Sequence, residues 1–305
     1  MKIVIAGGTG FLGRALARAL EGDGHEIVTL SRTAPGAPTG RVVQWIPNGT
    51  VGPWGTEIEN AGAVVNLAGE SIAARRWTPQ QRRRIFESRV LATRSLAAAI
   101  ARVSTPPSVL VSGSAVGYYG PLGDEVVAEE HAPGTDFLAR ICADWEAEAM
   151  RASVAGTRVA RIRTGLVLAR DGGALPRMLL PFWLGAGGPV GSGRQYWPWI
   201  HRQDWIDLVR WVLETPGASG AFNATAPNPV TNAEFARALG RALGRPAFMP
   251  TPGLALRLLL GAMADALLLS GQRAVPARAE RLGFRFNFTQ IDDALGAIFG
   301  ARKAR

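Results

Sequence analysis

The stretch Gly7-Gly8-Thr9-Gly10-Phe11-Leu12-Gly13 decides the fold of this 305-residue chain. It follows the apolar run Lys2–Ala6, which is typical of a buried parallel strand, and it leads into residues 11–21, whose apolar positions have helical spacing. Glycine is needed here because the backbone has to turn tightly and approach a phosphate closely, and a Cβ atom would obstruct both. The helix that follows offers free N–H groups and the positive end of its dipole to an anion. Strand, turn and helix together predict a pyrophosphate site rather than a purely structural glycine turn.

Strand and helix patterns alternate from this point to residue 163. The expected strands are residues 26–30, 42–45, 63–67, 108–112 and 158–162, and the expected helices are residues 79–103 and 137–152. Such alternation predicts βαβ units, and right-handed crossovers then give a doubly wound parallel sheet with helices on both faces. The expected fold is therefore a Rossmann fold of the α/β class.

Glycine, proline and tryptophan become frequent after residue 163, and this change predicts a second domain. We expect a dinucleotide-binding domain at residues 1–163, to which residues 196–224 return with a helix at 204–214 and a strand at 221–224. Residues 164–195 and 225–305 are then a smaller, mostly helical lid that contacts the substrate. The apolar stretch Leu254–Leu269 contains Arg257 and Asp265 and is too short to span a membrane. It predicts a buried or dimer-facing helix in preference to a membrane-surface helix, and the chain is compatible with a homodimer.

Composition narrows the classes of function. Hydrophobic residues make up 47% and charged residues 19%, as in globular rather than disordered chains. The net charge of +10 comes from arginines spread along the chain, and their cluster at residues 75–84 lacks the interleaved aromatic residues of an RNA-binding surface, so no nucleic-acid partner is expected. Cys142 is the single cysteine, which excludes an intramolecular disulfide and fits a reducing compartment; without a signal-peptide pattern, the cytoplasm is expected. No metal-ligand spacing is present, and no metal is expected.

The end of the second expected strand indicates which dinucleotide is bound. NAD sites usually carry an acidic residue there, which binds the ribose 2′-hydroxyl. This chain has Ser31 and Arg32 instead. A guanidinium pairs well with a 2′-phosphate, and a hydroxyl adds a hydrogen bond. The sequence therefore favours NADP(H) over NAD(H), with a solvated arginine as the alternative.

Three further stretches carry a resemblance to a known family. They are Asn66-Leu67-Ala68-Gly69-Glu70, residues 112–120 (SGSAVGYYG) and residues 191–201 (GSGRQYWPWIH). With the glycine loop, the whole chain resembles the atypical extended short-chain dehydrogenase/reductases, and within them the NAD-dependent epimerase/dehydratase-like proteins, often called sugar-nucleotide epimerases. The resemblance implies that residues 66–69 line the cofactor near its ribose and nicotinamide. It also implies that the serines of the fifth strand face the nicotinamide, and that further polar side chains surround the same site; these residues are Ser112, Ser114, Glu70, Arg89 and Arg163.

The chain departs from that family at its catalytic pair. Short-chain dehydrogenases use a Tyr-x-x-x-Lys pair on the helix after the fifth strand, where the lysine lowers the tyrosine pKa. The corresponding positions here are Leu138 and Cys142, and neither performs that chemistry at neutral pH. A lone cysteine with apolar neighbours is more often a packing residue than a nucleophile. We therefore expect Ser114 and Tyr118 to be the catalytic groups. The resemblance implies a catalytic serine four residues before the loop tyrosine, and Ser114 has this spacing from Tyr118. The residue four positions before Tyr119 is Ala115, whose side chain has no group to donate.

Two classes of function follow. The first is an NADP(H)-dependent oxidoreductase, or an epimerase/dehydratase, acting on a small molecule. Arg75, Arg76 and Trp77 would then form a rim that receives an anionic substrate, and the aromatic stretch at 196–199 would stack on a sugar or another flat or apolar group. The second is a non-catalytic protein that senses NADP(H) or binds partners in response to it. His201 and Asp204 invite comparison with a catalytic triad, but their position predicts structural roles.

Overall fold

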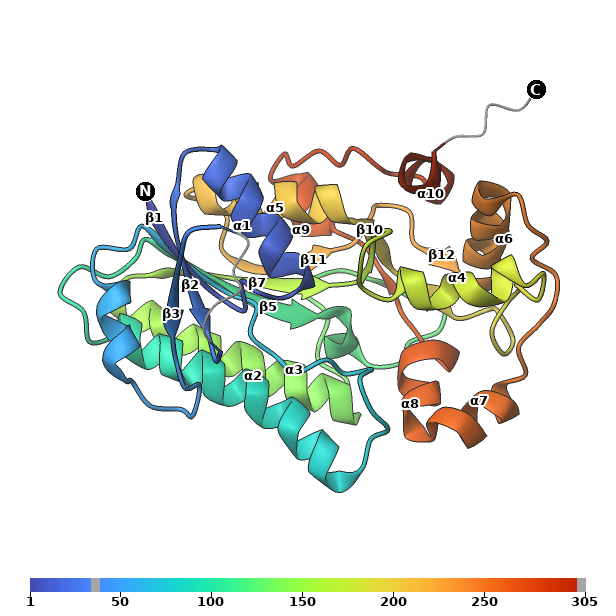
Figure 1. Cartoon of the computed structure of the whole chain (residues 1–305), viewed down its shortest axis with the longest axis horizontal. Helices are drawn as coiled ribbons and strands as arrows, with labels where there is room; N and C mark the ends of the chain where they lie inside the picture. Colours follow the sequence, from blue (N-terminus) through green and yellow to red (C-terminus); the bar gives the residue numbers. More distant parts are fainter. Residues whose placement is uncertain (34–38, 301–305) are drawn as a thin grey trace. The chain divides into compact units, whose positions relative to one another are not determined.

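The computed structural model of the chain describes residues 1–33 and 39–300. Within them, the central sheet has seven strands in the order β11-β7-β5-β4-β1-β2-β3 (Figure 1). The strands are β1 (Lys2–Ala6), β2 (Glu26–Ser31), β3 (Arg41–Gln44), β4 (Ala63–Asn66), β5 (Val109–Ala115), β7 (Arg158–Thr164) and β11 (Gly220–Ala224). The neighbouring pairs from β3 to β5 are all parallel. The order reverses between β1 and β4, which confirms the predicted doubly wound Rossmann fold.

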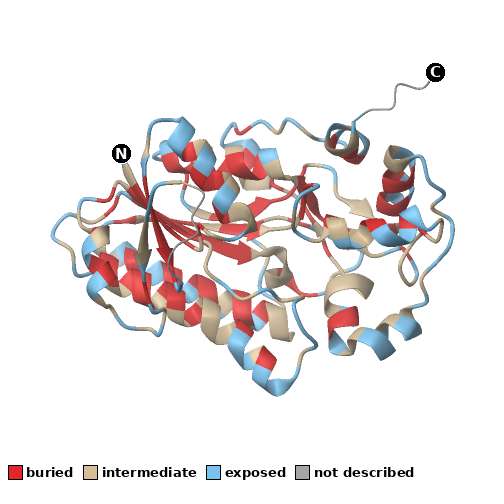
Figure 2. Ribbon diagram, viewed as in Figure 1, coloured by how far each residue is buried: buried red, intermediate tan, exposed pale blue. Residues whose placement is uncertain are grey.

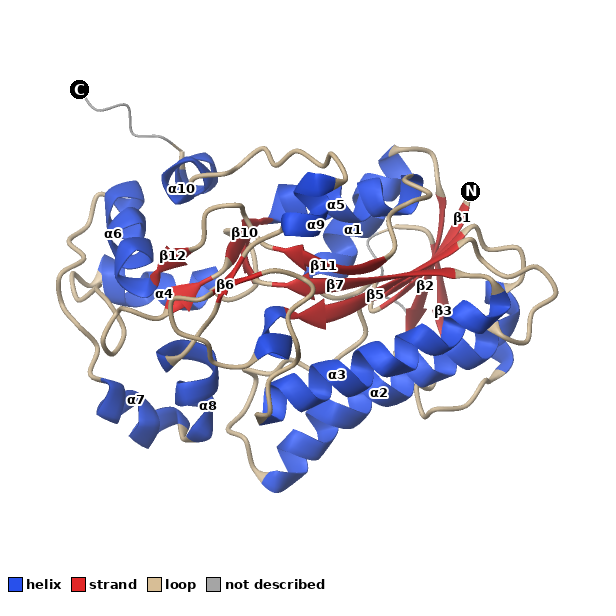
Figure 3. Cartoon of the chain, turned by 180° about the vertical axis from the view of Figure 1, so that it is seen from behind, coloured by secondary structure: helices blue, strands red, loops and turns tan. Residues whose placement is uncertain are grey.

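Helices cover both faces of this sheet. Figures 1 and 3 show α2 (Pro79–Ile100) and α3 (Phe137–Met150) on one face, and α1 (Phe11–Gly22) and α5 (Arg202–Glu214) on the other. The side chain of Thr78 caps α2 by accepting a hydrogen bond from the N–H of Gln81 at 3.1 Å. Because both faces are covered, the inner strands are mostly apolar and largely buried, and they form the buried layer seen in Figure 2.

The register of the sheet aligns the carboxyl ends of four strands. Leu30, Ala6, Asn66 and Ser112 are consecutive partners across β2, β1, β4 and β5. Neighbouring parallel strands lie about 4.8 Å apart. The residues that follow these partners therefore leave the sheet side by side at one edge. In an open α/β sheet, this edge at the switch point is where ligands bind.

Two local predictions differ from the structure. Strand β5 continues three residues beyond the expected end at Ser112, so that Ser114 lies within the strand. Gly113 and Ser114 have little intrinsic preference for strands, and pairing within the sheet overrides that preference. Between residues 164 and 198, where no helix was expected, the structure has the helix α4 (Leu175–Trp183), which contains Pro181.

The described chain divides into two compact units. One comprises Met1–Ala115, Arg140–Arg163 and Ile206–Phe222, and the other contains the remaining described residues. The other short elements of the chain are η1 (Pro53–Ile58), η2 (Val116–Tyr119), β6 (Val126–Val127), η3 (Arg151–Ala155), β8 (Leu166–Leu168), β9 (Tyr196–Trp197), β10 (Trp199–His201), β12 (Val230–Thr231), α6 (Asn232–Leu243), α7 (Gly253–Leu260), α8 (Ala262–Ala264), η4 (Asp265–Leu269), β13 (Arg273–Ala274), α9 (Ala277–Arg281) and α10 (Ile291–Phe299). The assignment of a lid role to part of the chain stays a prediction.

The apolar stretch at residues 254–269 was predicted to be a buried or dimer-facing helix, and the structure contradicts the buried alternative. It forms α7, α8 and η4, and none of the α7 residues is buried. Leu254, Leu258 and Leu259 are each about two-thirds to three-quarters exposed. Helix α7 ends after eight residues because Gly261 takes a positive φ of 63°, so the stretch never becomes one long helix. No helix in the described part of the chain is long and apolar enough to cross a membrane.

Candidate functional site

The glycine loop is built by close approaches of backbone to backbone. Gly7 has a φ of 82°, and a Cβ on it would lie 2.6 Å from the carbonyl oxygen of Leu67. A Cβ on Gly13 would collide with the carbonyl oxygen of Gly7, so the first turn of α1 packs directly on the loop. Gly10 precedes α1 and provides no side-chain cap for its first N–H groups. The loop therefore fits a group that accepts hydrogen bonds from these N–H groups, as a phosphate does.

Arg14 is a residue of this loop that the sequence analysis missed. Its Nε donates a hydrogen bond to the carbonyl oxygen of Thr9 at 2.7 Å, which holds the guanidinium beside the loop. The first turn of α1 contains no acidic residue. A cation at the positive end of a helix dipole is unfavourable unless an anion accompanies it. An arginine directly after the last glycine of the loop was thus a signal for an anion site.

Ser31 is the last residue of β2, and Arg32 follows it; both come directly after Leu30, which is the β2 member of the aligned row. Ser31 is buried, and its Oγ accepts a hydrogen bond from the N–H of Thr33 at 3.4 Å. Arg32 is exposed, and its guanidinium forms no salt bridge within the described residues. The end of β2 therefore carries a solvent-facing cation without a carboxylate partner.

Asn66 shapes the turn after β4 from inside the protein. Its side chain is fully buried, its Nδ2 donates to Thr93 Oγ1 at 2.7 Å, and its Oδ1 accepts from the N–H of Ala68 at 3.2 Å. These bonds fix residues Leu67 and Ala68 against the glycine loop. Asn66 acts on the edge of the sheet through the backbone that it holds.

Gly69, Glu70 and Arg89 lie together beyond this turn. The Glu70 carboxylate accepts a hydrogen bond from Gln81 Nε2 at 2.9 Å. Arg89 is half-buried, and its Cζ lies 3.1 Å from the position of a Cβ on Gly69 and 5.4 Å from the ring centre of Trp145. Burial lowers the pKa of the Arg89 guanidinium. Arg89 forms no salt bridge in the part of the chain that the structure describes, so glycine at residue 69 leaves room beside a partly desolvated cation.

A buried ionic cluster lies at the end of β5, on the same unit. Ser114 Oγ donates to Glu146 Oε1 at 2.7 Å. Arg163 Nε donates to Glu146 Oε1 at 2.8 Å and its Nη2 to Oε2 at 2.9 Å, and Arg161 Nη1 adds a bond to Oε2 at 3.2 Å. Ser114, Glu146 and Arg163 are each at most 5% exposed. Glu146 was not singled out from the sequence, because an acidic residue in a helix rich in Glu and Ala gives no distinguishing pattern.

Ser112 on β5 and Cys142 on α3 are both buried. Ser112 is fully buried, with its Oγ 3.4 Å from the carbonyl oxygen of Gly113. Burial, with a smaller contribution from the Glu146 carboxylate, raises the pKa of the Cys142 thiol to about 12. Cys142 is therefore protonated at neutral pH, as expected of a packing residue and not of a nucleophile.

The two tyrosines of η2 have different surroundings. Tyr119 is 1% exposed, and its hydroxyl donates to Asn223 Oδ1 at 2.7 Å. Tyr118 is half-buried, and its ring meets that of Tyr119 edge to face at 5.4 Å. The hydroxyl of Tyr119 is thus used inside the protein, and Tyr118 is the stronger candidate of the pair.

Comparison with known proteins identifies the family. The model of the NAD dependent epimerase/dehydratase family matches residues 3–224. The chain belongs to this family. Residues 251–298 also match a domain of unknown function, DUF1731.

Relatives of this epimerase/dehydratase family match nearly the whole chain. The epimerase family protein SDR39U1 of Bos taurus is 42% identical over 98% of this chain and 99% of its own length. The crystal structure of human SDR39U1 (isoform 2) with NADPH has a TM-score of 0.88 at 37% identity, covering 98% of this chain and 99% of that one. A nucleoside-diphosphate sugar epimerase from Corynebacterium glutamicum has a TM-score of 0.80 at 36% identity, covering 98% of this chain and 58% of that one.

Two tryptophans and an aspartate that the sequence singled out are buried and contact only protein groups that support the fold. Trp197 and Trp199 are buried in an apolar core with Phe235, so they are not free to stack on a substrate as predicted. Asp204 is fully buried, and its carboxylate accepts hydrogen bonds from the N–H groups of Asn287 and Phe288 at 2.8 and 2.9 Å. Asp204 therefore holds the segment before α10, in line with a structural role.

The expected rim for an anionic substrate is exposed. Arg75 and Arg76 are exposed, and Trp77 donates its indole N–H to the carbonyl oxygen of Ile72 at 2.8 Å. In residues 1–33 and 39–300, no group of three or more His, Cys, Asp and Glu side chains is placed to hold a metal ion.

Proposed function

We propose that this chain binds NADP(H) at the carboxyl edge of its central sheet. The glycine loop Gly7–Gly13, with Arg14, holds the pyrophosphate, and Arg32 with Ser31 holds the 2′-phosphate. The observation that carries the proposal is the cradle at Gly7 and Gly13, where added Cβ atoms meet backbone, together with Arg32 directly after β2, whose guanidinium forms no salt bridge within the described residues. The NADPH present in the structure of human SDR39U1 supports the same cofactor.

The turns after β4 and β5 are proposed to lie along the rest of the dinucleotide. Residues Leu67, Ala68 and Gly69 would line its ribose, since they leave the sheet beside Gly7. Asn66 would act by holding this backbone, and Arg163 by holding Glu146, because both side chains are buried among protein partners. Ser112, Glu70 and Arg89 would complete the surroundings of the nicotinamide half.

We further propose oxidoreductase or epimerase/dehydratase chemistry on a small anionic or sugar-like substrate. The bound nicotinamide supplies or accepts hydride. Ser114 donates its proton to Glu146, so its oxygen lone pairs are left to accept a hydrogen bond from a substrate hydroxyl. Tyr118 is the candidate for proton transfer. Two observations favour an anionic substrate such as a sugar nucleotide. Arg75 and Arg76 are exposed, and the similar Corynebacterium glutamicum protein is described as a nucleoside-diphosphate sugar epimerase.

A screen of NADPH turnover tests the catalytic proposal. The purified protein is incubated with NADPH and a broad panel of carbonyl compounds that includes sugar nucleotides, and loss of the reduced nicotinamide absorbance is followed. We expect turnover with at least one class, reduced about a hundredfold by Ser114→Ala while NADPH binding is kept. Tight binding without turnover on any compound would contradict the proposal.

That last outcome defines the second candidate function, a non-catalytic NADP(H) sensor. The observation that favours it is that the groups expected to perform catalysis are absent, protonated or already hydrogen-bonded to protein. Leu138 replaces the tyrosine, Cys142 stays protonated, and the Ser114 hydroxyl is bonded to Glu146. A sensor should change its hydrogen-exchange pattern outside residues 1–33 on binding NADPH and show no turnover.

A further inference from the structure

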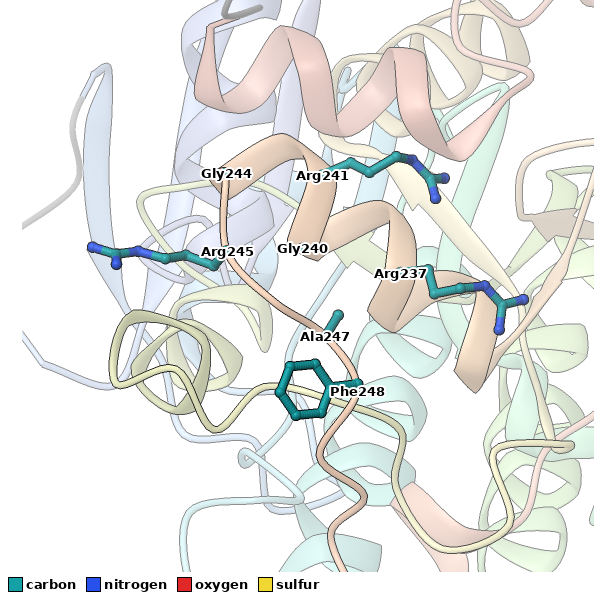
Figure 4. Close-up of a pocket in the computed structure, with 7 residues that line it drawn as sticks. All are labelled: Arg237, Gly240, Arg241, Gly244, Arg245, Ala247 and Phe248. Carbon is teal, nitrogen blue, oxygen red and sulfur yellow. The ribbon is translucent and has the colours of Figure 1, made fainter.

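An open hollow of about 500 Å³ lies along the second half of helix α6, far along the chain from the glycine loop (Figure 4). Its lining includes Phe248 and three small residues, Gly240, Gly244 and Ala247, which we call the floor. Three arginines, Arg237, Arg241 and Arg245, complete its lining. The hollow therefore joins a floor of small residues to a rim of positive charge.

The sequence builds this floor with two glycines spaced one helical turn apart. Gly244 ends α6 with a φ of 62°, and the N–H of Arg245 then donates to the carbonyl oxygen of Gly240 at 2.9 Å. A Cβ on Gly240 would lie 2.7 Å from the Cβ of Ala247, so the following segment folds back onto the helix where it has no side chain. The floor is thus apolar and tightly packed.

The rim consists of three arginines with four-residue spacing. Arg237 and Arg241 lie on one face of α6, whereas Arg245 follows the end of the helix, where the positive φ of Gly244 turns the chain away. Arg241 pairs with Asp292 through three hydrogen bonds of 2.7–3.0 Å, so that carboxylate already balances much of its charge, although both side chains are more than half exposed. Arg237 and Arg245 form no salt bridge within the described residues. A positive charge near a helix C-terminus interacts favourably with the helix dipole. This interaction accounts for arginine at the end of α6 but not for the apolar surface beside it.

The apolar surface comes from Phe248, which is 74% exposed, and from the adjoining Met249, which is 47% exposed. Figure 4 shows the Phe248 ring next to Ala247 on the segment that returns from the end of the helix, with Arg245 directed to one side of the hollow and Arg237 and Arg241 to the other. Because the guanidinium groups diverge, they do not converge on a single phosphate. Their arrangement fits an extended ligand with an apolar residue between separated negative charges.

We propose that this hollow is a docking site for an acidic peptide segment of another protein, in which an aromatic or aliphatic residue packs on Phe248 and the flanking carboxylates pair with the arginines. Charge complementarity favours this occupant. A second copy of the chain is disfavoured, because each copy carries a net charge of +10. The proposal is independent of the NADP(H) site, since no residue of the hollow belongs to the glycine loop or to strands β1–β5.

Peptide selection tests the proposal. A random peptide library displayed on phage is panned on the full-length protein, after subtraction on the double variant Arg237→Glu/Arg245→Glu. We expect enrichment of peptides in which Asp or Glu flanks Phe, Trp, Leu or Met. No enrichment, or enrichment of basic or uncharged peptides, would overturn it.

The enriched peptide is then labelled and its binding measured by fluorescence anisotropy at two salt concentrations. Affinity should fall about tenfold or more in Arg237→Glu/Arg245→Glu and in Phe248→Ala, and should weaken with salt. The control Arg18→Glu/Arg102→Glu changes the net charge equally at exposed sites elsewhere and should bind as the parent does. Phe248→Ala alters an exposed side chain, so folding, checked by circular dichroism, is kept.

Three results would overturn the proposal. Equal loss of binding in the control double variant would indicate non-specific attraction to a basic protein. Displacement of the peptide by inorganic phosphate or AMP at low concentration would indicate a nucleotide or phosphate site. Dimerisation of the parent protein that Phe248→Ala abolishes, measured by analytical ultracentrifugation, would assign the hollow to a second copy of this chain.

Discussion

Two neighbouring parts of one sheet edge differ in how their polar groups are used. At the ends of β1 and β2, Gly10 leaves the first turn of α1 uncapped, and Arg32 has no carboxylate partner within the described residues. At the ends of β5 and β7, Ser114, Glu146 and Arg163 satisfy one another in a buried cluster. The first part thus offers donors and a cation to an anionic ligand. The named groups of the second are bonded to one another, although the buried Nε of Arg161 has no hydrogen-bond partner among the described residues.

This difference separates binding from catalysis. Donors and cations at a strand end are stabilised by an anionic ligand, and on this ground we propose the first part as the cofactor half of the site. In the other half, the buried Glu146 carboxylate already accepts hydrogen bonds from the Ser114 hydroxyl and from the guanidinium groups of Arg161 and Arg163. Chemistry there requires either that substrate oxygen bonds to Ser114 as it stands or that the cluster rearranges.

The largest expected effect is on stability and comes from Glu146→Gln. This change removes the carboxylate that pairs with the buried Arg163 guanidinium, and breaking a buried pair in this way costs about 3–5 kcal/mol. Urea unfolding followed by circular dichroism measures it. Glu87→Gln, which removes one member of an exposed pair with Arg83, is the matched control and should change little. Equal stability of the two variants would mean that the closed cluster does not support the fold.

The next effect is on cofactor binding and comes from Gly13→Ala. The added Cβ meets the Gly7 carbonyl and displaces the loop, so NADPH affinity should fall about a hundredfold, or about 2.7 kcal/mol. Gly22→Ala places the same methyl group at the far end of α1, where no atom lies within 4 Å. Titration of NADPH fluorescence compares the two. If Gly22→Ala weakens binding as much, the loop is not the pyrophosphate site.

A smaller and selective effect is expected from Arg32→Ala. Loss of a charge-assisted contact to the 2′-phosphate should weaken NADPH binding about tenfold and leave NADH binding nearly unchanged. Arg18→Ala, an exposed arginine on α1, is the control and should affect neither. Equal losses for both nucleotides would refute the role of Arg32.

The smallest effect at neutral pH concerns Cys142. In the folded protein burial holds the thiol pKa at about 12, whereas an unfolded cysteine titrates near ~8.5. Above that pH the folded state binds the extra proton, so stability should fall as pH rises from ~8.5 toward 12. Cys142→Ala should flatten this part of the pH profile and leave NADPH affinity unchanged. A native thiol that reacts quickly with iodoacetamide at neutral pH would contradict the burial argument.

The fold followed from local pattern because strand, glycine turn and amphipathic helix repeat in short segments, each with its own periodicity. Strand β5 ran longer than expected because sheet pairing carries Gly113 and Ser114, whose own preferences oppose it. Glu146 was missed because its importance comes from contacts with Ser114 and Arg163, which are distant in sequence. Trp197 and Trp199 were placed at the substrate because their aromatic character is visible in the sequence, whereas their burial in the core is not. Strands, turns and helices could thus be predicted from the local sequence. The partners and burial of polar and aromatic side chains could not, because they depend on tertiary contacts.

A crystal structure with NADPH bound would test the contrast between the open and closed parts of this edge most directly. The account predicts pyrophosphate oxygens on the N–H groups of Gly10–Gly13, the 2′-phosphate on the Arg32 guanidinium, and an unchanged Ser114–Glu146–Arg163 cluster. Binding of the 2′-phosphate away from Arg32, with Glu146 released to contact the cofactor, would contradict it.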